Sequence, residues 1–528
     1  MPVPVMTSTE YAIAQLPLHL RRYVVAQDYG KYTPRDQATW RHVMQRLTLH
    51  LRDKAHSSYL NGLKNAGIGM DTIPSLDEMN EKLVRIGWSA VAVRGFVPPA
   101  VFTELQSLRV LAIAADIRTH EHIAYTPAPD IIHESAGHAP ILMDPCYAEY
   151  VQRCGVAGFK AIASVEDQAV YEAIRNLSVV KEDPSSTPQD VENAEARLAA
   201  ASASRRYVSE STRASRLYWW TAEYGLVGEL AAPRIYGAGL LSSIGEAEHC
   251  LTPAVAKVPL SLLCAETEYD ITTMQPQLFV ARDFDHLFEL VKAFEATLAW
   301  KRGGDFGLEE AFKARTVNHL VLTEGLEITG RVARQISGAR LSPTLATALA
   351  HLTGPIARSR RGCSLDELPW LGEALIAFGL DMILPLGAFE VNLPSGLTLS
   401  GFATGPHEVI HLRGNLNGKP LDLPSWVQLF FSRELPSVAG GPGDPAAWDR
   451  WFGDLNAFAA GEAEQQARQR KAEALEPDLA ELYAATRRLR ESADRDVRSL
   501  GDLEARAAQH PGEWLLQAEL AELRKGIP

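Results

Sequence analysis

The spacing of hydrophobic residues changes at about residue 305, and this change limits the folds that the chain can adopt. From Tyr11 onwards, apolar side chains recur every three or four residues, which places them on one face of a helix. In 316–332 and 381–431 they alternate instead with polar residues, between turn residues, as in strands. From Ala446 to the end the helical spacing returns. The sequence therefore predicts a mainly α N-terminal domain, a small β-rich module and a helical C-terminal tail.

Three domains are expected along the chain. They cover residues 1–305, 306–435 and 436–528. A polar stretch near 181–207 interrupts the first domain like an insertion. Within it, Thr187 at the N-cap, Pro188 at the first helical position and Asp190 at the third predict a separate surface helix.

Local patterns predict individual elements. Helical spacing is clear in 36–51 and 102–117, and each range is predicted to be one helix. Asn417-Gly418 favours a type I′ turn, because both residue types tolerate the positive φ that this turn needs, and so it predicts a hairpin. The Pro- and Gly-rich run 436–445 is predicted to be a linker or a long loop.

Composition and charge exclude several classes of protein. With 528 residues, of which 46% are hydrophobic and 22% charged, the chain has a globular composition. Its net charge of −13 lacks the basic footprint that nucleic acids and anionic membranes require. Five cysteines without a CxxC pair indicate neither a disulfide framework nor a thiolate zinc site. No run approaches the roughly 18 apolar residues of a membrane span, and no secretory signal begins the chain, so we expect a cytoplasmic protein.

The most informative motif is the run YTPAPDIIHESAGHAPIL. In it His133 and His138 stand five residues apart, and Glu134 follows the first histidine. Five residues of α-helix turn through about 500°, which leaves the two imidazoles about 140° apart. They can share a metal ion only if the helix ends or bulges between them, and Gly137 is the residue expected to allow that.

A third ligand is expected from the run YWWTAEYGLVGE. Glu223 follows three aromatic residues in a segment apolar enough to be buried, where a carboxylate needs a partner or a metal. Two imidazoles and one carboxylate form the facial triad of non-haem Fe(II) oxygenases. On spacing alone, iron, zinc and no metal at all stay open. The zinc alternative is a hydrolase with Glu134 as general base, although its histidines would normally stand four residues apart.

Three separated runs, PDIIHESAGHAPIL, YWWTAEYGL and YGAGLLSSIGE, occur in the order found in the pterin-dependent aromatic amino acid hydroxylases. The chain resembles this family from about Tyr23 to Phe294. The resemblance implies the family's catalytic fold and a monooxygenase that uses Fe(II), tetrahydrobiopterin and O2. L-Phenylalanine to L-tyrosine is the expected reaction, and tryptophan or another aromatic amino acid is the alternative substrate.

The region after residue 305 lies outside this resemblance. Its C-terminal helices are expected to pack on the rest of the protein, with self-association of two chains as the alternative. A catalytically idle relative, with its role in a binding module after residue 305, is a further alternative. The intact set of proposed iron ligands argues against that alternative.

The resemblance also implies roles for individual residues. His133, His138 and Glu223 would bind Fe(II). Arg118 would hold the substrate carboxylate in a bidentate way, and Asp130 would hold Arg118. The further contacts implied are Thr126 and Ser242 with the polar end of the amino acid, Trp219 and Pro129 with its ring, Phe102 and Glu134 with the pterin, and Glu246 with the surrounding network.

Overall fold

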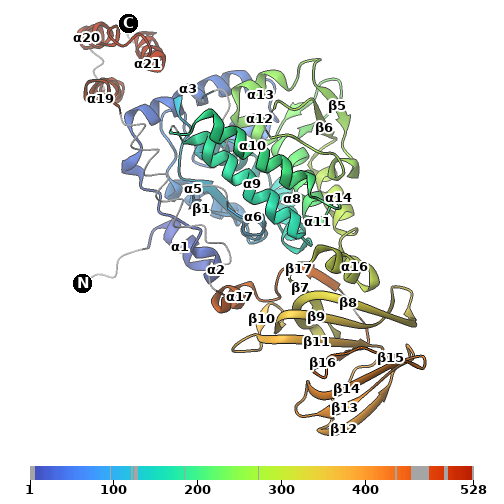
Figure 1. Cartoon of the computed structure of the whole chain (residues 1–528). Coiled ribbons are helices and arrows are strands. Elements are labelled where there is room, and N and C mark those ends of the chain that lie inside the picture. The colour runs from blue at the N-terminus through green and yellow to red at the C-terminus, as the bar shows by residue number, and fades with distance from the viewer. Residues whose placement is uncertain are drawn as a thin grey trace.

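The computed structural model describes residues 6–94, 97–120, 123, 129–183, 185–271, 273–434, 437–452, 475–492 and 497–525. A helical part lies at the centre, a large β-sheet lies below it and a group of C-terminal helices lies above it (Figure 1). The predicted succession of helical, β-rich and helical segments is therefore confirmed. Because the sheet is large, however, the chain as a whole mixes helices and strands and is not mainly α.

The central part consists mainly of helices and contains two small sheets. Its helices are α1 (Ser8–Gln15), α2 (Leu18–Arg21), α3 (Pro34–Leu51), α4 (Ser58–Asn65), α5 (Leu76–Leu83), α6 (Pro99–Ser107), α7 (Ala139–Leu142), α8 (Pro145–Lys160), α9 (Val165–Glu182), α10 (Pro188–Ala203), α11 (Glu210–Tyr218), α12 (Ala238–Ser242), α13 (Ile244–His249), α14 (Phe284–Glu295), α15 (Ala299–Arg302) and α16 (Gly304–Ala314). The parallel pair of strands is β1 (Ser89–Val93) and β2 (Val110–Ala114). The second sheet has the order β4 (Arg234–Ile235), β3 (Leu226–Val227), β6 (Gln277–Ala281) and β5 (Ala256–Pro259).

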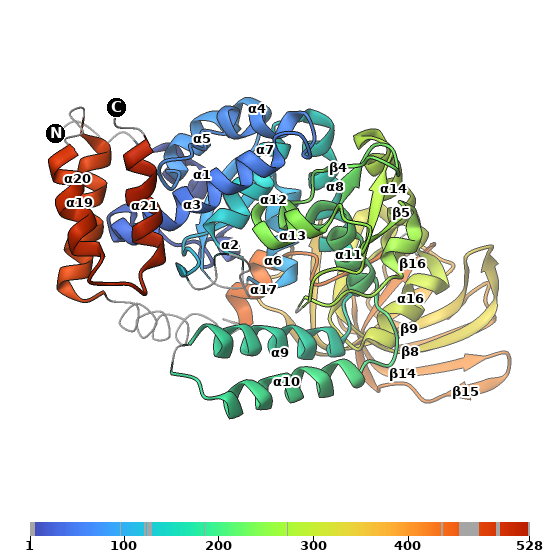
Figure 2. The same ribbon diagram turned by 90° about the horizontal axis from the view of Figure 1, so that it is seen from above.

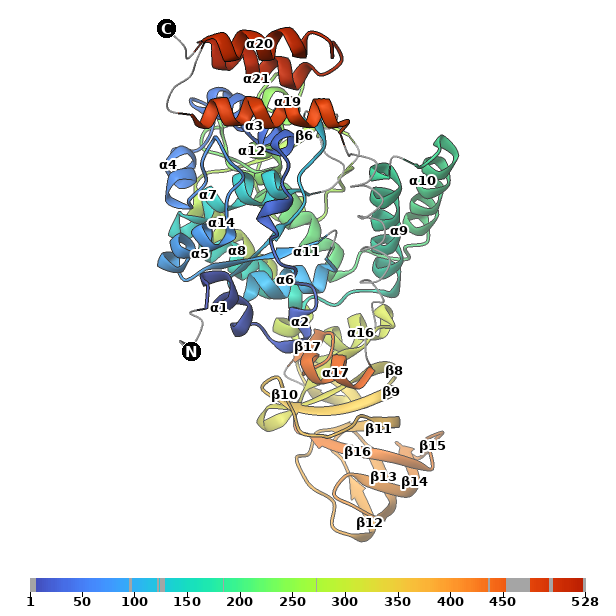
Figure 3. The ribbon, with the colours of Figure 1, turned by 90° about the vertical axis from the view of Figure 1, so that its left-hand side faces the viewer.

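Two of the predicted helices begin with a capping box. At α3, Thr33 accepts the backbone N–H of Asp36, and the Asp36 carboxylate accepts that of Thr33, which completes a capping box. At α10, Thr187 and Asp190 form the same box, so the predicted surface helix is confirmed. This helix pairs with α9 in a hairpin that stands at one side of the helical part (Figure 3).

The predicted helix over 102–117 is wrong in its second half. α6 ends at Ser107, Arg109 has a φ of 61°, and the chain then forms β2. All five residues of β2 are buried, so both of its faces are covered. An apolar run buried on both faces has no alternation that separates a strand from a helix, which explains the error.

The β-rich module is a single eleven-stranded sheet and is larger than expected. Its strands are β7 (Asn318–Val321), β8 (Leu326–Ser342), β9 (Leu345–Arg360), β10 (Cys363–Ser364), β11 (Trp370–Phe378), β12 (Gly387–Asn392), β13 (Leu397–Ala403), β14 (Glu408–Leu416), β15 (Lys419–Leu421), β16 (Trp426–Ser432) and β17 (Ser437–Gly440). Their main order is β12-β13-β14-β16-β11-β9-β8-β7-β17, and only β11 and β16 pair in parallel. Asn417 and Gly418 have φ of 49° and 84° between β14 and β15, which confirms the predicted turn.

The sheet is joined to the helical part through a shared apolar cluster. Ile162 and Ala299 of the helical part lie in one cluster with Leu320 and Phe430 of the sheet. β17 occupies part of the run that was predicted to be a linker, and it pairs with β7. The sheet thus continues past residue 435. The expected boundaries at 305 and 435 stay predictions.

The C-terminal helices contact the helical part. α17 (Pro445–Phe452) packs on α2, and the last three helices are α19 (Pro477–Glu491), α20 (Val497–Ala507) and α21 (Trp514–Lys525). Both α19 and α21 pack on α3 (Figure 2). Self-association through these helices stays a prediction. Within the described ranges, no helix combines the length and apolar character needed to cross a membrane.

Gly62 generates a prediction about the packing of α4 on α7, the helix that follows His138. A Cβ at Gly62 would lie 2.0 Å from the backbone oxygen of Pro140. We expect Gly62→Ala to lower the free energy of unfolding by at least about 1–3 kcal/mol, because backbone cannot move aside cheaply. Denaturant unfolding measures this. The control is Gly501→Ala in α20, where no atom lies within 4 Å of the added Cβ; equal stability of the two variants would contradict the prediction.

Candidate metal centre

The segment that carries His133 and His138 is a π-helix, η4 (Ile132–His138). Asp130 stabilises its start, because the Asp130 side chain accepts the backbone N–H of His133 at 3.0 Å and its carbonyl accepts that of Glu134 at 3.0 Å. A π-helix is bonded from residue i to i+5 and is wider than an α-helix. Residues five apart therefore lie on one face.

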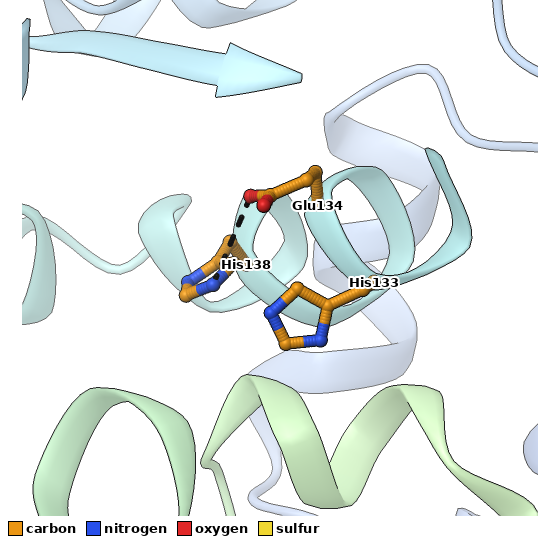
Figure 4. A group of neighbouring side chains, drawn as sticks. All are labelled: His133, Glu134 and His138. Carbon is orange, nitrogen blue, oxygen red and sulfur yellow. Dashed lines mark ion pairs between the residues drawn. The ribbon is translucent and has the colours of Figure 1, made fainter. Parts of the chain in front are cut away.

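The two imidazoles meet in the way that this geometry predicts. The ring centroids of His133 and His138 are 5.1 Å apart and the ring planes cross at 84° (Figure 4). The expected bulge is thus present. Gly137 serves a different purpose from the one predicted, since it has no positive φ. A Cβ there would lie 2.7 Å from the carbonyl oxygen of Ala238, so Gly137 allows α12 to approach η4 closely.

Glu223 reaches the same point from a second π-helix, η5 (Trp219–Glu223), which continues α11. The backbone N–H of Tyr224 donates to the carbonyl of Trp219 at 2.8 Å, a bond of the i to i+5 type. One carboxylate oxygen of Glu223 lies 3.2 Å from Nε2 of His133 and the other lies 3.2 Å from Nε2 of His138. Burial would raise the pKa of Glu223, but the two imidazoles lower it well below its usual range. The three side chains therefore converge on one point.

Glu134 is a second carboxyl group near the imidazoles. Its Oε2 lies 3.9 Å from Nε2 of His138 and has no hydrogen-bond partner within the described part of the chain (Figure 4). His133, Glu134 and His138 offer ligand atoms within 4.8 Å of one another. Burial raises the pKa of Glu134 to about 8, despite the lowering effect of His138. Glu223 lies 3.2 Å from both imidazoles, whereas Glu134 lies 3.9 Å from His138, so the geometry favours Glu223 over Glu134 as the third ligand.

Ser242 determines which nitrogen of His133 carries the proton. The Ser242 hydroxyl donates to the carbonyl of Ala238 at 2.7 Å, so it accepts a hydrogen bond from Nδ1 of His133 at 3.0 Å. With the proton on Nδ1, the lone pair of Nε2 is free on the side of Glu223. A hydrogen bond of this kind orients a metal-binding histidine. The role predicted for Ser242, contact with the amino acid, stays a prediction, while the structure gives it a contact with His133.

Arg118 and Asp130 form a buried bidentate ion pair. Nε of Arg118 donates to Oδ2 of Asp130 and Nη2 donates to Oδ1, each at 2.8 Å. Nη1 donates to the carbonyl of Ser242 at 3.1 Å. Asp130 therefore holds Arg118 as expected.

Aromatic side chains surround the centre. The ring of Trp219 stacks on Tyr269, with centroids 4.3 Å apart, and on Tyr224 at 4.5 Å. Trp219 thus stacks on two aromatic rings of the protein itself, and its contact with the ring of the amino acid stays a prediction. Phe102 meets the ring of Tyr218 edge-on at 5.6 Å, and Tyr218 stacks on His138 at 6.4 Å. α6 is thereby connected to the metal centre.

The remaining predicted residues are Glu246, Pro129 and Thr126. Glu246 is buried, its Oε1 has no partner within the described residues, and burial raises its pKa to about 7. Pro129 is exposed beside Asp130. Thr126 lies outside the described residues, so its contact with the amino acid stays a prediction.

The sequence interpretation missed Tyr218, Tyr269 and Gln275. Gln275 is buried, and its side-chain oxygen accepts Nε1 of Trp219 at 3.4 Å. Tyr218 begins the aromatic run that contains Trp219, so its position beside the metal ligands could have been inferred. Tyr269 and Gln275 lie about fifty residues further along the chain, and no local pattern connects them with Trp219.

The sequence profile and the sequence relatives identify one family. A sequence profile described as biopterin-dependent aromatic amino acid hydroxylase matches residues 19–175 and 193–322. The phenylalanine-4-hydroxylase of Mesorhizobium japonicum is 31% identical over 286 residues, which are 53% of this chain and 87% of the relative. That of Chromobacterium violaceum is 30% identical over 270 residues, 51% of this chain and 76% of the relative. A crystal structure of C. violaceum phenylalanine hydroxylase with iron(III) and 7,8-dihydrobiopterin is 28% identical, covers 56% of this chain and 92% of that one, and has a TM-score of 0.42.

Ser242→Ala tests whether Ser242 orients His133. The variant removes the acceptor of the Nδ1 proton, so we expect metal affinity to fall about 10–100-fold with little change in the fold. A competition titration with Fe(II) measures the affinity. The control is Ser261→Ala, which removes an exposed hydroxyl at the start of a short 3-10 helix. Equal affinity of both variants would show that Ser242 does not orient the ligand.

Asp130→Ala tests the buried ion pair. It leaves the Arg118 guanidinium buried without its partner, so the free energy of unfolding should fall by about 3–5 kcal/mol. Burial raises the pKa of Asp130, but Arg118 lowers it further, to below its usual range. The stabilisation is therefore present above the ordinary pKa of an aspartate and is lost as the pH falls through the lowered value, so the two proteins should converge in stability in acid.

Urea unfolding at several pH values measures this. The control is Glu289→Ala, which removes an exposed ion pair with Arg282 that contributes at most about 1 kcal/mol. A loss for Asp130→Ala as small as that of the control would contradict a buried pair.

Proposed function

The chain belongs to the biopterin-dependent aromatic amino acid hydroxylase family, and we propose that it converts L-phenylalanine to L-tyrosine with Fe(II), tetrahydrobiopterin and O2. The observation that carries this proposal is the convergence of Glu223 on Nε2 of both His133 and His138, at 3.2 Å each. Relatives about 30% identical are phenylalanine-4-hydroxylases, which supports phenylalanine as the substrate.

The donor set fits ferrous iron. His133, His138 and Glu223 would hold Fe(II) by two imidazoles and one carboxylate, a set that leaves three coordination positions open. When bound, Fe(II) supplies the activation of O2 and the tetrahydropterin supplies two electrons. The hydrogen bond from Nδ1 of His133 to Ser242 keeps Nε2 of His133 unprotonated for this purpose.

Arg118 would orient the amino acid. A planar guanidinium matches the two oxygens of a carboxylate. Asp130 fixes the Arg118 guanidinium in advance through two hydrogen bonds of 2.8 Å. Because the same Asp130 side chain accepts the backbone N–H of His133, the group that would hold the substrate and the helix that would hold iron share one anchor. Such positioning contributes to the rate by holding the ring in place.

The aromatic and acidic residues around the centre would complete the site. Trp219 and the exposed Pro129 would line the ring of the amino acid. Phe102 would stack on the pterin, since its own face is only partly covered within the protein. The unpartnered Oε2 of Glu134 would meet the pterin. Glu246 would complete the network behind the substrate, beside the backbone of Gln275.

A product assay tests the function. Purified protein is incubated with Fe(II), tetrahydrobiopterin, O2 and each of phenylalanine, tryptophan and tyrosine. We expect tyrosine from phenylalanine as the main product. If hydroxylated tryptophan were the only product, the substrate would be tryptophan and not phenylalanine. No hydroxylated product at all would refute the proposal. If the protein binds zinc and its activity does not depend on the pterin, the result would instead support the hydrolase with Glu134 as general base.

His138→Ala tests the ligand set. Loss of one imidazole should abolish stoichiometric iron and reduce tyrosine formation by at least about 100-fold, because a residue that binds the metal directly contributes more than a residue that only orients it. Metal analysis and turnover are measured together. His411→Asn is the control, since His411 is exposed in β14 and asparagine tolerates its positive φ. Retained iron and turnover in His138→Ala would remove His138 from the set.

A further inference from the structure

Helix α3 is buried on more than one face. The sequence predicts a single apolar face, and the structure also buries Arg41, which is 3% exposed. Arg41 is covered because α19 and α21 lie against this side of α3 (Figure 2). A charged residue is rarely buried without a partner, so the contact that Arg41 makes is informative about the C-terminal helices.

The partner of Arg41 is Glu519 of α21. Nε of Arg41 donates to both carboxylate oxygens of Glu519 at 3.1 Å, and Nη2 contacts one of them as well. Nη1 donates to the carbonyl of Asp71 at 3.1 Å. The two side chains are 3% and 4% exposed. A buried pair of this kind costs desolvation on both sides, but it is specific, because removal of Glu519 leaves the Arg41 charge buried without its carboxylate. Arg490 of α19 also contacts Glu519, at 3.5 Å.

Further contacts strengthen the same docking. Arg490 of α19 contacts Glu522 of α21 at 3.0 Å, and Gln45 of α3 donates to Glu522. The rings of His42 and Trp514 meet edge-on with centroids 5.1 Å apart. The C-terminal helices therefore hold about one turn of α3 through charged, polar and aromatic contacts.

Further along α3, Arg46 and His50 contact the helices beside the metal centre. α3 packs on α12 and α13. Nε2 of His50 lies 3.0 Å from the carbonyl oxygen of Ala247, and Arg46 contacts Glu248 at 3.2 Å. α12 ends at Ser242, and the hydroxyl of Ser242 accepts the hydrogen bond from Nδ1 of His133. One helix thus lies between the C-terminal helices and the segment that orients a proposed iron ligand.

The family profile ends at residue 322, so α19, α20 and α21 lie beyond it. We propose that these helices are a positioning element of the metal centre, and that Arg41 and Glu519 are positioning residues that act through α3, α12 and Ser242 on His133. The pair fixes the position of α3, and α3 in turn limits the motion of α12. Loss of the pair loosens the hydrogen bond that orients the imidazole. Only the effect of these helices on turnover rests on the proposed function.

Glu519→Ala and Glu519→Gln in the full chain test the proposal. Amide hydrogen exchange of residues 238–249 reports on α12 and α13, and titration with Fe(II) alone reports on the metal centre. We expect Glu519→Ala to speed exchange in 238–249 and to weaken Fe(II) binding by about tenfold, the lower end of what loss of an orienting hydrogen bond causes. KM for the amino acid should change less than the Fe(II) affinity.

The control is Glu504→Ala, which removes an exposed ion pair with Arg524 between α20 and α21. It disturbs the C-terminal helices without touching α3, so exchange in 238–249 and Fe(II) affinity should match those of the unaltered protein. Glu519→Gln keeps the shape of the side chain and replaces Glu519→Ala if that variant does not fold.

Faster exchange confined to residues 475–525, with unchanged Fe(II) affinity, would overturn the proposal and leave the pair with a role in docking alone. Hydrogen exchange gives this answer even in a protein that hydroxylates no amino acid. Failure of the proposed function is therefore distinguishable from failure of this inference.

Discussion

The five-residue separation of His133 and His138 is the constraint on which the centre depends. In an α-helix these residues would point in different directions, and only the wider turn of a π-helix brings both to one point. Neighbouring contacts support this uncommon turn: Asp130 accepts N–H groups at its start, and Gly137 lets α12 pack closely behind it. Glu223 arrives from a second π-helix, so both halves of the proposed ligand set depend on the same departure from α-helical geometry.

Asp130 connects the parts of the site. One carboxylate accepts hydrogen bonds from the backbone N–H of His133, from the backbone N–H of Arg118 and from the Arg118 side chain. The group expected to hold the substrate is thereby fixed relative to the group expected to hold iron. Both Arg118 and Asp130 are buried, and charges interact more strongly where water is excluded. This arrangement favours a rigid site over one that forms only when ligands bind.

Individual elements show where sequence patterns suffice and where they fail. The helix start at Thr187 and the Asn417-Gly418 turn follow from local chemistry, and each is confirmed. β2 and the central strands β9 and β11 were not predicted as strands. Their apolar residues face both sides of a sheet, so the alternation that reveals an edge strand is missing.

The sequence by itself determined the family, the donor types of the proposed iron site and the succession of helical and β-rich segments, because these follow from local motifs and from hydrophobic spacing. Only the tertiary structure decided that Ser242 contacts His133, that Tyr269 and Gln275 surround Trp219, and that Glu519 pairs with Arg41. Those contacts join residues up to 478 positions apart. No local pattern encodes such a contact, since it exists only once the packing of whole helices has placed both side chains together.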